Sequence, residues 1–498
     1  MYYPSKKEFK KLSKKGNLIP VYRELVADLE TPVSAFMKID TGRYSYLLES
    51  VEGQEKIARY SFLGSNPSLL LKIKDNNVWI HEKSGSKFKE KKYKLEKDPI
   101  EEIKKIIQQY KFVDVPGLPR FCGGLVGYIS YDTVRFFEKI PDKNPDDLKL
   151  PDAVFMLTDT ILIFDHIAHK IKIVSNVHIQ DKSASGLDDI YEKSIKKIDH
   201  IADMLSRKLK AHRKSKRSGA VKVKSNMTKS EFKKAVEKAK KYIIAGDIIQ
   251  TVISQRFSAK ISMPAIDLYR ALRTINPSPY MYYLKLGDMK IVGASPEVMV
   301  RCEANIAEVR PIAGTRKRGK DEDEDKKLSI ELLNDPKERA EHIMLVDLGR
   351  NDLGRVCKFG SVVVEDLMTI EKYSHVMHIV SDVHGQIEKG KNAFDVIRAT
   401  FPAGTVSGAP KIRAMEIIDE LENVRRGPYA GSIGYFSFSG NIDTCITIRT
   451  IVCKGNKAYV QAGAGIVADS VPEKEYQETV NKAQAMLKSI EVAQEGLL

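Results

Sequence analysis

Two acidic motifs with the spacing E-x-x-E are the clearest chemical signal in the sequence. They lie in residues 337–352 (KERAEHIMLVDLGRND) and 470–491 (SVPEKEYQETVNKAQAMLKSIE), and their members are Glu338, Glu341, Glu475 and Glu478. Residues three apart share a helix face, so each motif can present two carboxylates together. One such motif is typical of a solvated acidic surface. Two that face one cleft would offer oxygen ligands only, which suit Mg²⁺ with its retained waters.

Two helices must carry these motifs. In the first, Ala340, Ile343 and Met344 predict an apolar stripe. In the second, Pro472 suits the first helical turn. The apolar positions that follow it at helical spacing are Tyr476, Val480, Ala483, Leu487 and Ile490. Lys482 shares the face of Glu475 and Glu478 on that helix.

The first half of the chain predicts a β-rich region with short helices. Runs of strand-forming residues between turn residues are Tyr44–Val51, Arg59–Gly64, Ser68–Ile73, Val78–His81, Gly123–Ser130 and Ala153–His166. Helices are predicted over Pro99–Tyr110 and Gly186–Lys210. A further helix begins with a capping box of Thr228 and Glu231 and stops at Gly246.

The second half does not alternate strands and helices as regular βαβ units, which gives little support to a Rossmann or barrel fold. Gln250–Phe257 predicts a strand, with Gln250, Val252, Ser254 and Arg256 on one face. Gly463 and Gly465 lack the third glycine and the following helix of a dinucleotide loop. In a strand, such glycines more often mark a close backbone approach.

The formal charge of +16 raises the question of a nucleic-acid partner. Much of the excess lies in Met1–Lys15 and in Arg207–Lys224, which has nine Lys or Arg, no acid and no aromatic residue to stack on bases. We therefore interpret the second stretch as a solvated linker. Five cysteines without a C-x-x-C pair favour reduced thiols in a cytoplasm. No apolar h-region follows the lysine-rich N-terminus, so we expect no secretion. No apolar run reaches about eighteen residues, so we expect no membrane span.

Several long strings together resemble the chorismate-utilising enzymes, over about residues 18–493. They are residues 337–352 with PIAGT (311–315), FPAGTVSGAPK (401–411) and EYQETVNKA (475–483). The resemblance implies an α+β fold, two large antiparallel β-sheets packed as a sandwich with helices outside. It also implies an N-terminal domain over 17–180 with a tryptophan site, a helix and basic linker over 181–226, and a chorismate-binding catalytic domain over 227–498.

The resemblance also implies roles for the acids and for the residues around them. Glu341 and Glu478 would hold Mg²⁺ directly, while Glu338 and Glu475 would orient its waters. Arg449, in the alternating string CITIRTIV, would bind the enolpyruvyl carboxylate of chorismate with its planar fork, although alone it fits a surface arginine. The substrate-binding positions implied are Gly314, Thr315, Tyr429, Arg449, Gly463, Gly465 and Lys482.

Four positions are implied to be catalytic. Glu297 in GASPE would protonate the departing C4 hydroxyl. His378 would orient the ring or remove the C2 proton, although a lone histidine in an apolar strand usually belongs to the core. Thr405 would line the site. Gln250 stands where isochorismate-forming relatives have a lysine.

The product follows from two missing lysines. Ala313 stands where aminodeoxychorismate synthases have a lysine nucleophile, and Gln250 lacks the base that water needs. Ammonia should then add at C2 and give anthranilate and pyruvate, unless both residues merely fill space. The alternatives are an aminodeoxychorismate synthase, an isochorismate or salicylate synthase, and a basic nucleic-acid-binding protein on the same fold.

Partners are implied in the same way. No G-x-C-x-G nucleophile elbow occurs, so ammonia is expected from a separate glutamine amidotransferase subunit. Tryptophan is expected as an inhibitor, with a pocket formed by Glu49, Ser50, Pro279, Tyr280 and Met281. We expect no nucleic-acid and no membrane partner.

Overall fold

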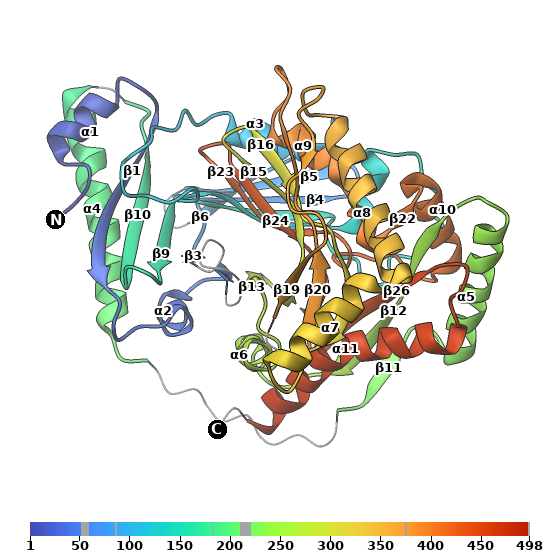
Figure 1. Cartoon of the computed structure of the whole chain (residues 1–498). Helices are drawn as coiled ribbons and strands as arrows, with labels where there is room; N and C mark the ends of the chain where they lie inside the picture. The colour runs from blue at the N-terminus through green and yellow to red at the C-terminus, as the bar shows by residue number, and fades with distance from the viewer. Residues whose placement is uncertain (51–58, 85–86, 182, 210–220, 374–375, 497–498) are drawn as a thin grey trace.

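The computed structural model describes residues 1–50, 59–84, 87–181, 183–209, 221–373 and 376–496. These residues form two large antiparallel sheets with helices on their outer sides (Figure 1). The fold class predicted from the sequence is confirmed.

The larger sheet, called sheet A here, has twelve strands in the described part of the chain. In spatial order they are β1 (Leu18–Val26), β10 (Lys170–His178), β9 (Thr160–Asp165), β3 (Tyr60–Ser65), β2 (Tyr44–Glu49), β13 (Tyr280–Leu286), β14 (Met289–Ser295), β25 (Thr450–Lys454), β26 (Lys457–Ile466), β12 (Gln250–Lys260) and β11 (Val223–Ser225), with β22 (Gly408–Ala409) also paired to β12.

The second sheet, sheet B, has eleven described strands, and a small sheet C has three. Those of sheet B are, in spatial order, β18 (Val363–Val364), β21 (Val383–Gln386), β16 (Ile306–Val309), β15 (Val298–Glu303), β24 (Ile442–Ile446), β23 (Ser432–Ser437), β7 (Gly124–Ile129), β8 (Ala153–Thr158), β4 (Leu69–Lys74), β5 (Asn77–Ser84) and β6 (Lys87–Lys94). Those of sheet C are β17 (Ile312–Lys317), β20 (Val376–Val380) and β19 (Thr369–Lys372).

Both large sheets take strands from before and after the basic linker. In sheet A, β2 pairs with β13, and in sheet B, β7 pairs with β23. The two halves of the sequence therefore share their sheets, while the division at residues 180 and 226 stays a prediction. Residues 210–220 of the linker and Val51 of the first predicted strand lie outside the described residues.

The helices cover the outer faces of the sheets (Figure 1). Their bounds are α1 (Lys6–Leu12), α2 (Pro32–Ile39), α3 (Pro99–Ile107), α4 (Ala184–Ser206), α5 (Lys229–Ile244), α6 (Ala265–Ile275), α7 (Glu322–Asn334), α8 (Pro336–Gly354), α9 (Ala393–Thr400), α10 (Lys411–Leu421) and α11 (Pro472–Glu495), with 3₁₀ turns η1 (Tyr131–Phe136) and η2 (Gly404–Val406). The predicted capping box of α5 and the position of Pro472 in the first turn of α11 are confirmed.

The main apolar core lies between the sheets and continues under α2, α4, α6 and α11. Leu47 and Leu284 of sheet A belong to the same buried cluster as Tyr128 and Met156 of sheet B. Each fully buried side chain of this size contributes roughly 1.5–3 kcal/mol of burial free energy. Strands of both sheets are thus fixed to one large core.

The predicted apolar stripe of α8 is wrong as a description of its packing. Ala340 is exposed and Ile343 is 47% exposed, whereas the buried positions include His342, Leu345 and Val346. The helix is rotated so that its acids are half-buried, which the rule of an inward apolar face does not anticipate.

The predicted single alternating strand CITIRTIV is also wrong. Its first part is the end of β24 in sheet B and its last part is β25 in sheet A. Arg449 lies at the crossing with a φ of 50°, a left-handed conformation that non-glycine residues adopt rarely. The predicted strand Ala153–His166 likewise divides into β8 and β9, which belong to different sheets.

The sequence also predicts reduced cysteines and no membrane-spanning segment. The five cysteines are free and buried. In the part of the chain that the structure describes, no helix is long and apolar enough to cross a membrane.

Candidate active site

The two acid pairs approach the same stretch of β26, Gly463–Gly465. Glu341 of α8 accepts a hydrogen bond of 3.0 Å from Gln250 Nε2, and a Cβ atom on Gly465 would lie only 2.5 Å from that nitrogen. Glu478 of α11 forms an ion pair of 2.7 Å with Lys482, whose Nζ donates to the Gly463 carbonyl at 3.2 Å. The two motifs, far apart in the sequence, thus reach the same strand through Gln250 and Lys482.

In each acid pair, burial and the neighbouring carboxylate disfavour the charged form of one glutamate, and a bound cation would offset this effect. Burial raises the pKa of Glu338, and the charge of Glu341 raises it further. Burial also raises the pKa of Glu475, as does Glu478 to a smaller extent. Arg316 Nη1, 3.4 Å from Glu338 Oε1, provides part of the compensation.

The donor set fits Mg²⁺ in its chemistry. All four donors are carboxylates, and Mg²⁺ takes one or two directly and keeps waters in its other positions. Among the described residues, no three His, Cys, Asp or Glu side chains are gathered tightly enough to form a metal centre by themselves. The assignment of Glu338, Glu341, Glu475 and Glu478 to a metal therefore stays a prediction.

Glu297 has the environment of a general acid. It is 7% exposed, and burial raises its pKa to about 8, against smaller opposing effects of Thr405 and Lys482. A carboxyl with this pKa is mostly protonated at neutral pH. The Thr405 hydroxyl is buried beside it and has no hydrogen-bond partner of good geometry.

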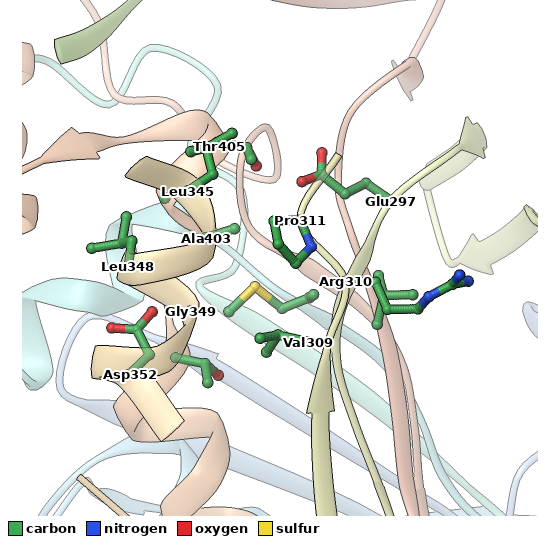
Figure 2. A pocket seen from close by; sticks show the side chains of 14 residues that line it. Glu297, Val309, Arg310, Pro311, Leu345, Leu348, Gly349, Asp352, Ala403 and Thr405 are labelled. Atoms are coloured by element: carbon green, nitrogen blue, oxygen red, sulfur yellow. The ribbon is translucent and has the colours of Figure 1, made fainter. Parts of the chain in front are cut away.

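A pocket opens between Glu297 and helix α8 (Figure 2). Glu297 and Thr405 lie at one end of it and Asp352 at the other, while Arg310 points away from it. Its other lining residues are Val298, Met299, Val309, Pro311, Leu345, Leu348, Gly349, Thr400, Ala403 and Gly404.

His378 is arranged to accept a proton. Its Nδ1 lies 2.8 Å from the Gly314 carbonyl and 3.1 Å from Thr315 Oγ1. A carbonyl oxygen only accepts, so Nδ1 carries the hydrogen and Nε2 is left with its lone pair. Burial lowers the pKa of His378, the Gly314 contact opposes this, and the charge of Arg449 adds to the lowering. The lowered pKa favours the neutral form of the ring.

Gly314 joins His378 to the acid pair of α8. Its φ of 64° requires a left-handed conformation, and a Cβ there would lie 3.1 Å from Glu338 Oε2. A larger residue here would be strained in its backbone and would crowd Leu332 and this carboxylate.

Arg449 and Tyr429 are two further buried groups of the candidate site. Burial lowers the pKa of Arg449, while Glu478 and Tyr429 act against this, and the group stays charged. Tyr429 is buried with a pKa raised to about 12, so its hydroxyl keeps its proton. A Cβ on Gly463 would lie 2.8 Å from that hydroxyl, so glycine makes room for the tyrosine.

The structure also places the five residues predicted to bind tryptophan. Glu49 and Met281 face each other across β2 and β13. Ser50 follows Glu49, and its buried hydroxyl has no hydrogen-bond partner among the described residues. Glu49 already accepts hydrogen bonds from Tyr269 and Arg273. Tyr280 donates to Asp443 at 2.8 Å, and Pro279 is buried beside it.

Sequence reasoning missed two buried ion pairs around the site. Lys411 Nζ lies 2.6 Å from Asp352, and Arg426 lies 2.6 Å from Glu422. The second pair is four residues apart, but Glu422 is the C-cap of α10 and the chain is not helical from there to Arg426, so no helical pattern signals it.

Comparison with known proteins gives one consistent family. The family model described as chorismate binding enzyme matches residues 43–488. Anthranilate synthase component 1 of Acetivibrio thermocellus is 51% identical over 501 residues, covering 99% of this chain and 100% of the relative. The same protein of Aquifex aeolicus is 51% identical over 495 residues, covering 99% and 98%.

Solved structures agree. Anthranilate synthase component I from Streptococcus pneumoniae superposes with a TM-score of 0.77 at 37% identity, covering 93% of this chain and 99% of that chain. A menaquinone-specific isochorismate synthase from Escherichia coli superposes with a TM-score of 0.69 at 18% identity, covering 97% and 98%, and shows the shared fold alone.

Proposed function

Because the chain belongs to the chorismate-binding enzymes and is similar along its whole length to anthranilate synthase component I, we propose that it converts chorismate and ammonia into anthranilate and pyruvate. The observation that carries this choice of product is the contact of Gln250 Nε2 with Glu341 at 3.0 Å. Gln250 thus presents an amide to the acid pair, where a lysine would present an amine that could act as a base.

The chain's own groups can perform the steps in order. Ammonia adds at C2 of the ring while the C4 hydroxyl leaves as water with the proton of Glu297. The C2 proton then passes to Nε2 of His378, the bond from C3 to the ether oxygen breaks, and the enolpyruvyl group departs to become pyruvate on protonation. Loss of this group makes the ring aromatic.

Substrate orientation follows from the charges. The Arg449 guanidinium is proposed to pair with the enolpyruvyl carboxylate, supported by the Tyr429 hydroxyl and by Lys482. Gly314, Thr315, Gly463 and Gly465 are proposed to line the ring. At the three glycines a Cβ atom would lie within 3.1 Å of Glu338, Tyr429 or Gln250.

Mg²⁺ is the proposed cofactor. Glu341 and Glu478 would hold it directly, and Glu338 and Glu475 through water, and the bound ion would neutralise the ring carboxylate. The mutual repulsion within each pair supports this proposal.

A glutamine amidotransferase subunit is the proposed source of ammonia, in keeping with the component numbering of the relatives' names. Tryptophan is the proposed inhibitor, and the unpaired buried hydroxyl of Ser50 supports a polar ligand near β2. The free cysteines are compatible with a cytoplasmic enzyme.

The test is incubation of the purified chain with chorismate, Mg²⁺ and ammonium, followed by chromatographic identification of products. Anthranilate and pyruvate are expected in equal amounts, with glutamine active only when the amidotransferase subunit is added. Isochorismate or 4-amino-4-deoxychorismate as the main product would refute the proposal.

A further inference from the structure

Arg426 is a fully buried cation with an unusually complete set of partners. Its side chain is 2% exposed. Nη1 donates to the Val406 carbonyl at 2.7 Å, and Nη2 donates to the Val252 carbonyl at 2.7 Å. Nε and Nη2 donate to the two oxygens of Glu422 at 3.0 and 2.6 Å. The charge is thus neutralised by Glu422, and the same guanidinium group holds two backbone carbonyls.

Each backbone partner belongs to an element of the candidate site. Val406 ends the η2 turn, in which Thr405 lies beside Glu297 (Figure 2). Val252 lies two residues after Gln250 on β12 and pairs in register with Gly465. The Val252 N–H also donates to the Ser407 carbonyl at 2.9 Å. One side chain therefore ties the Thr405 turn to the strand of Gln250.

Aromatic contacts extend this set to Tyr429. The Arg426 guanidinium carbon lies 5.5 Å from the centre of the Tyr429 ring and 4.7 Å from that of Tyr131. Cation–π contacts of this kind are strongest where water is excluded. The Tyr429 ring, whose hydroxyl lies at Gly463, is thereby fixed in its orientation.

Glu422 is held in turn by Ser254. The Ser254 N–H and hydroxyl donate to Glu422 Oε1 at 2.9 and 2.7 Å, and Gln461 Nε2 donates to the same hydroxyl at 2.8 Å. All these groups are buried. Such a buried pair is weak evidence for a stabilising role, because burying two charges costs about as much free energy as their attraction returns.

We propose that Arg426, held by Glu422, is a positioning residue that fixes the Thr405 turn, β12 and Tyr429 relative to one another. Its effect on turnover rests on the proposed function, whereas its effect on these elements does not. Lysine cannot replace it, because a single ammonium cannot donate in four fixed directions or stack on two rings.

The test compares Arg426→Lys with Arg425→Lys. Arg425 is the adjacent residue, but it pairs with Asp142 at the surface, so it is a matched control. Misplacement of about 1 Å lowers kcat by roughly tenfold to a hundredfold, which is the loss expected for Arg426→Lys. The KM of Arg426→Lys for ammonium should stay within about twofold of the wild-type value. Both kcat and KM of Arg425→Lys should also stay within about twofold of the wild type.

Hydrogen exchange supplies a readout that needs no turnover. In Arg426→Lys, the amides of Val252, Val406 and Ser407 should exchange at least about tenfold faster, with unchanged exchange in β7 and β8 of sheet B. Arg425→Lys should leave all of these as in the wild type. If the wild type makes no anthranilate but these amides respond, the proposed function fails and the positioning role stands.

Two results would overturn the inference. One is an Arg426→Lys enzyme with wild-type kcat, and the other is a loss of kcat without faster exchange at the three amides. Should Arg426→Lys fail to fold, Ser254→Ala keeps the ion pair and removes one donor to Glu422. In Ser254→Ala, kcat should fall and the three amides should exchange faster, each by roughly threefold to tenfold. Wild-type kcat and exchange in a folded Ser254→Ala would equally count against the role.

Discussion

Gln250 and Glu341 are 91 residues apart in the chain, and the amide nitrogen of the first donates to the carboxylate of the second at 3.0 Å. Gln250 is 4% exposed and its Oε1 has no partner. The contact fixes which end of the amide faces the acid pair. It thereby links the residue proposed to select ammonia to the residues proposed to hold Mg²⁺.

A first prediction concerns this position and Ala313. Gln250→Lys should introduce a base for water and shift part of the product from anthranilate to isochorismate. Ala313→Lys should introduce an amine nucleophile and change the product spectrum by the route of the aminodeoxychorismate synthases. Products are identified by chromatography and mass. An unchanged spectrum and rate in both variants would remove the roles given to these residues.

A second prediction concerns the metal. Glu341→Gln and Glu478→Gln should each lower kcat/KM by more than about a hundredfold with an unchanged circular dichroism spectrum. EDTA should abolish wild-type turnover reversibly, and calorimetry should show weaker Mg²⁺ binding in both variants.

The control is Glu473→Gln. Glu473 lies on the same helix but forms surface ion pairs with Lys229 and Lys233, so its change should leave metal binding unaltered. Full activity of Glu478→Gln in metal-free buffer would sink the assignment.

A third prediction follows from the pKa of Glu297, raised to about 8 by burial. The acid form should be needed, so kcat/KM should fall as the pH rises through about 8, and Glu297→Gln should abolish that limb together with most activity. An alkaline limb that persists unchanged in Glu297→Gln would exclude this role.

The same pKa fixes the sign of a stability effect. Between its ordinary value of 4.5 and about 8, the folded chain binds the Glu297 proton and the unfolded chain does not. Unfolding then releases a proton, so the stability contribution of Glu297 is fully present below the lower value and is lost as the pH rises towards 8. Denaturant titrations should show a flatter pH dependence in Glu297→Gln over this window.

A fourth prediction concerns the strand glycines. A Cβ at Gly463 would displace the Tyr429 hydroxyl, and one at Gly465 would displace the Gln250 amide. Either glycine changed to alanine should raise the KM for chorismate or lower kcat by about tenfold or more and cost roughly 1–3 kcal/mol of stability. Gly354→Ala is the control, because nothing lies within 4 Å of its Cβ position and alanine favours a helix.

A fifth prediction concerns regulation. Tryptophan should bind and inhibit, and Ser50→Ala should weaken inhibition while nearly preserving turnover without tryptophan. Ser65→Ala on β3 is the control, because its hydroxyl is also buried and unpaired but lies outside the predicted pocket. Calorimetry without any binding at millimolar tryptophan would show that the pocket was wrongly carried over.

Local patterns were sufficient for several elements. The capping box of Thr228 and Glu231, the start of α11 at Pro472 and the strand that begins at Gln250 depend on neighbours within a few residues, and all three are confirmed. The family and its fold class also followed from contiguous strings, because these strings lie in the turns and helices that meet at the site.

The orientation of α8 did not follow from such patterns. Its apolar stripe was expected to be buried, yet the acids and His342 are turned inward. His342 bonds Ser381 at 2.6 Å, Glu338 meets Arg316 and Glu341 meets Gln250. These three partners come from three other segments of the chain. The orientation of a helix depends on all the segments that it contacts, and its own pattern of apolar residues does not show which segments these are.

The sequence by itself determined which groups are available for chemistry: paired glutamates, a histidine in a strand and an arginine. It also determined which are absent, namely the lysines that related enzymes have in place of Gln250 and Ala313. Only the tertiary structure decided which of the groups present meet. It turned CITIRTIV into a crossing between two sheets with Arg449 at the corner, buried Glu297 until its pKa rose, and placed Arg426 among Val252, Val406 and Tyr429. The reason is physical. Residue type sets charge and hydrogen-bonding capacity, whereas pKa and orientation depend on burial and on neighbours that folding brings from distant parts of the chain.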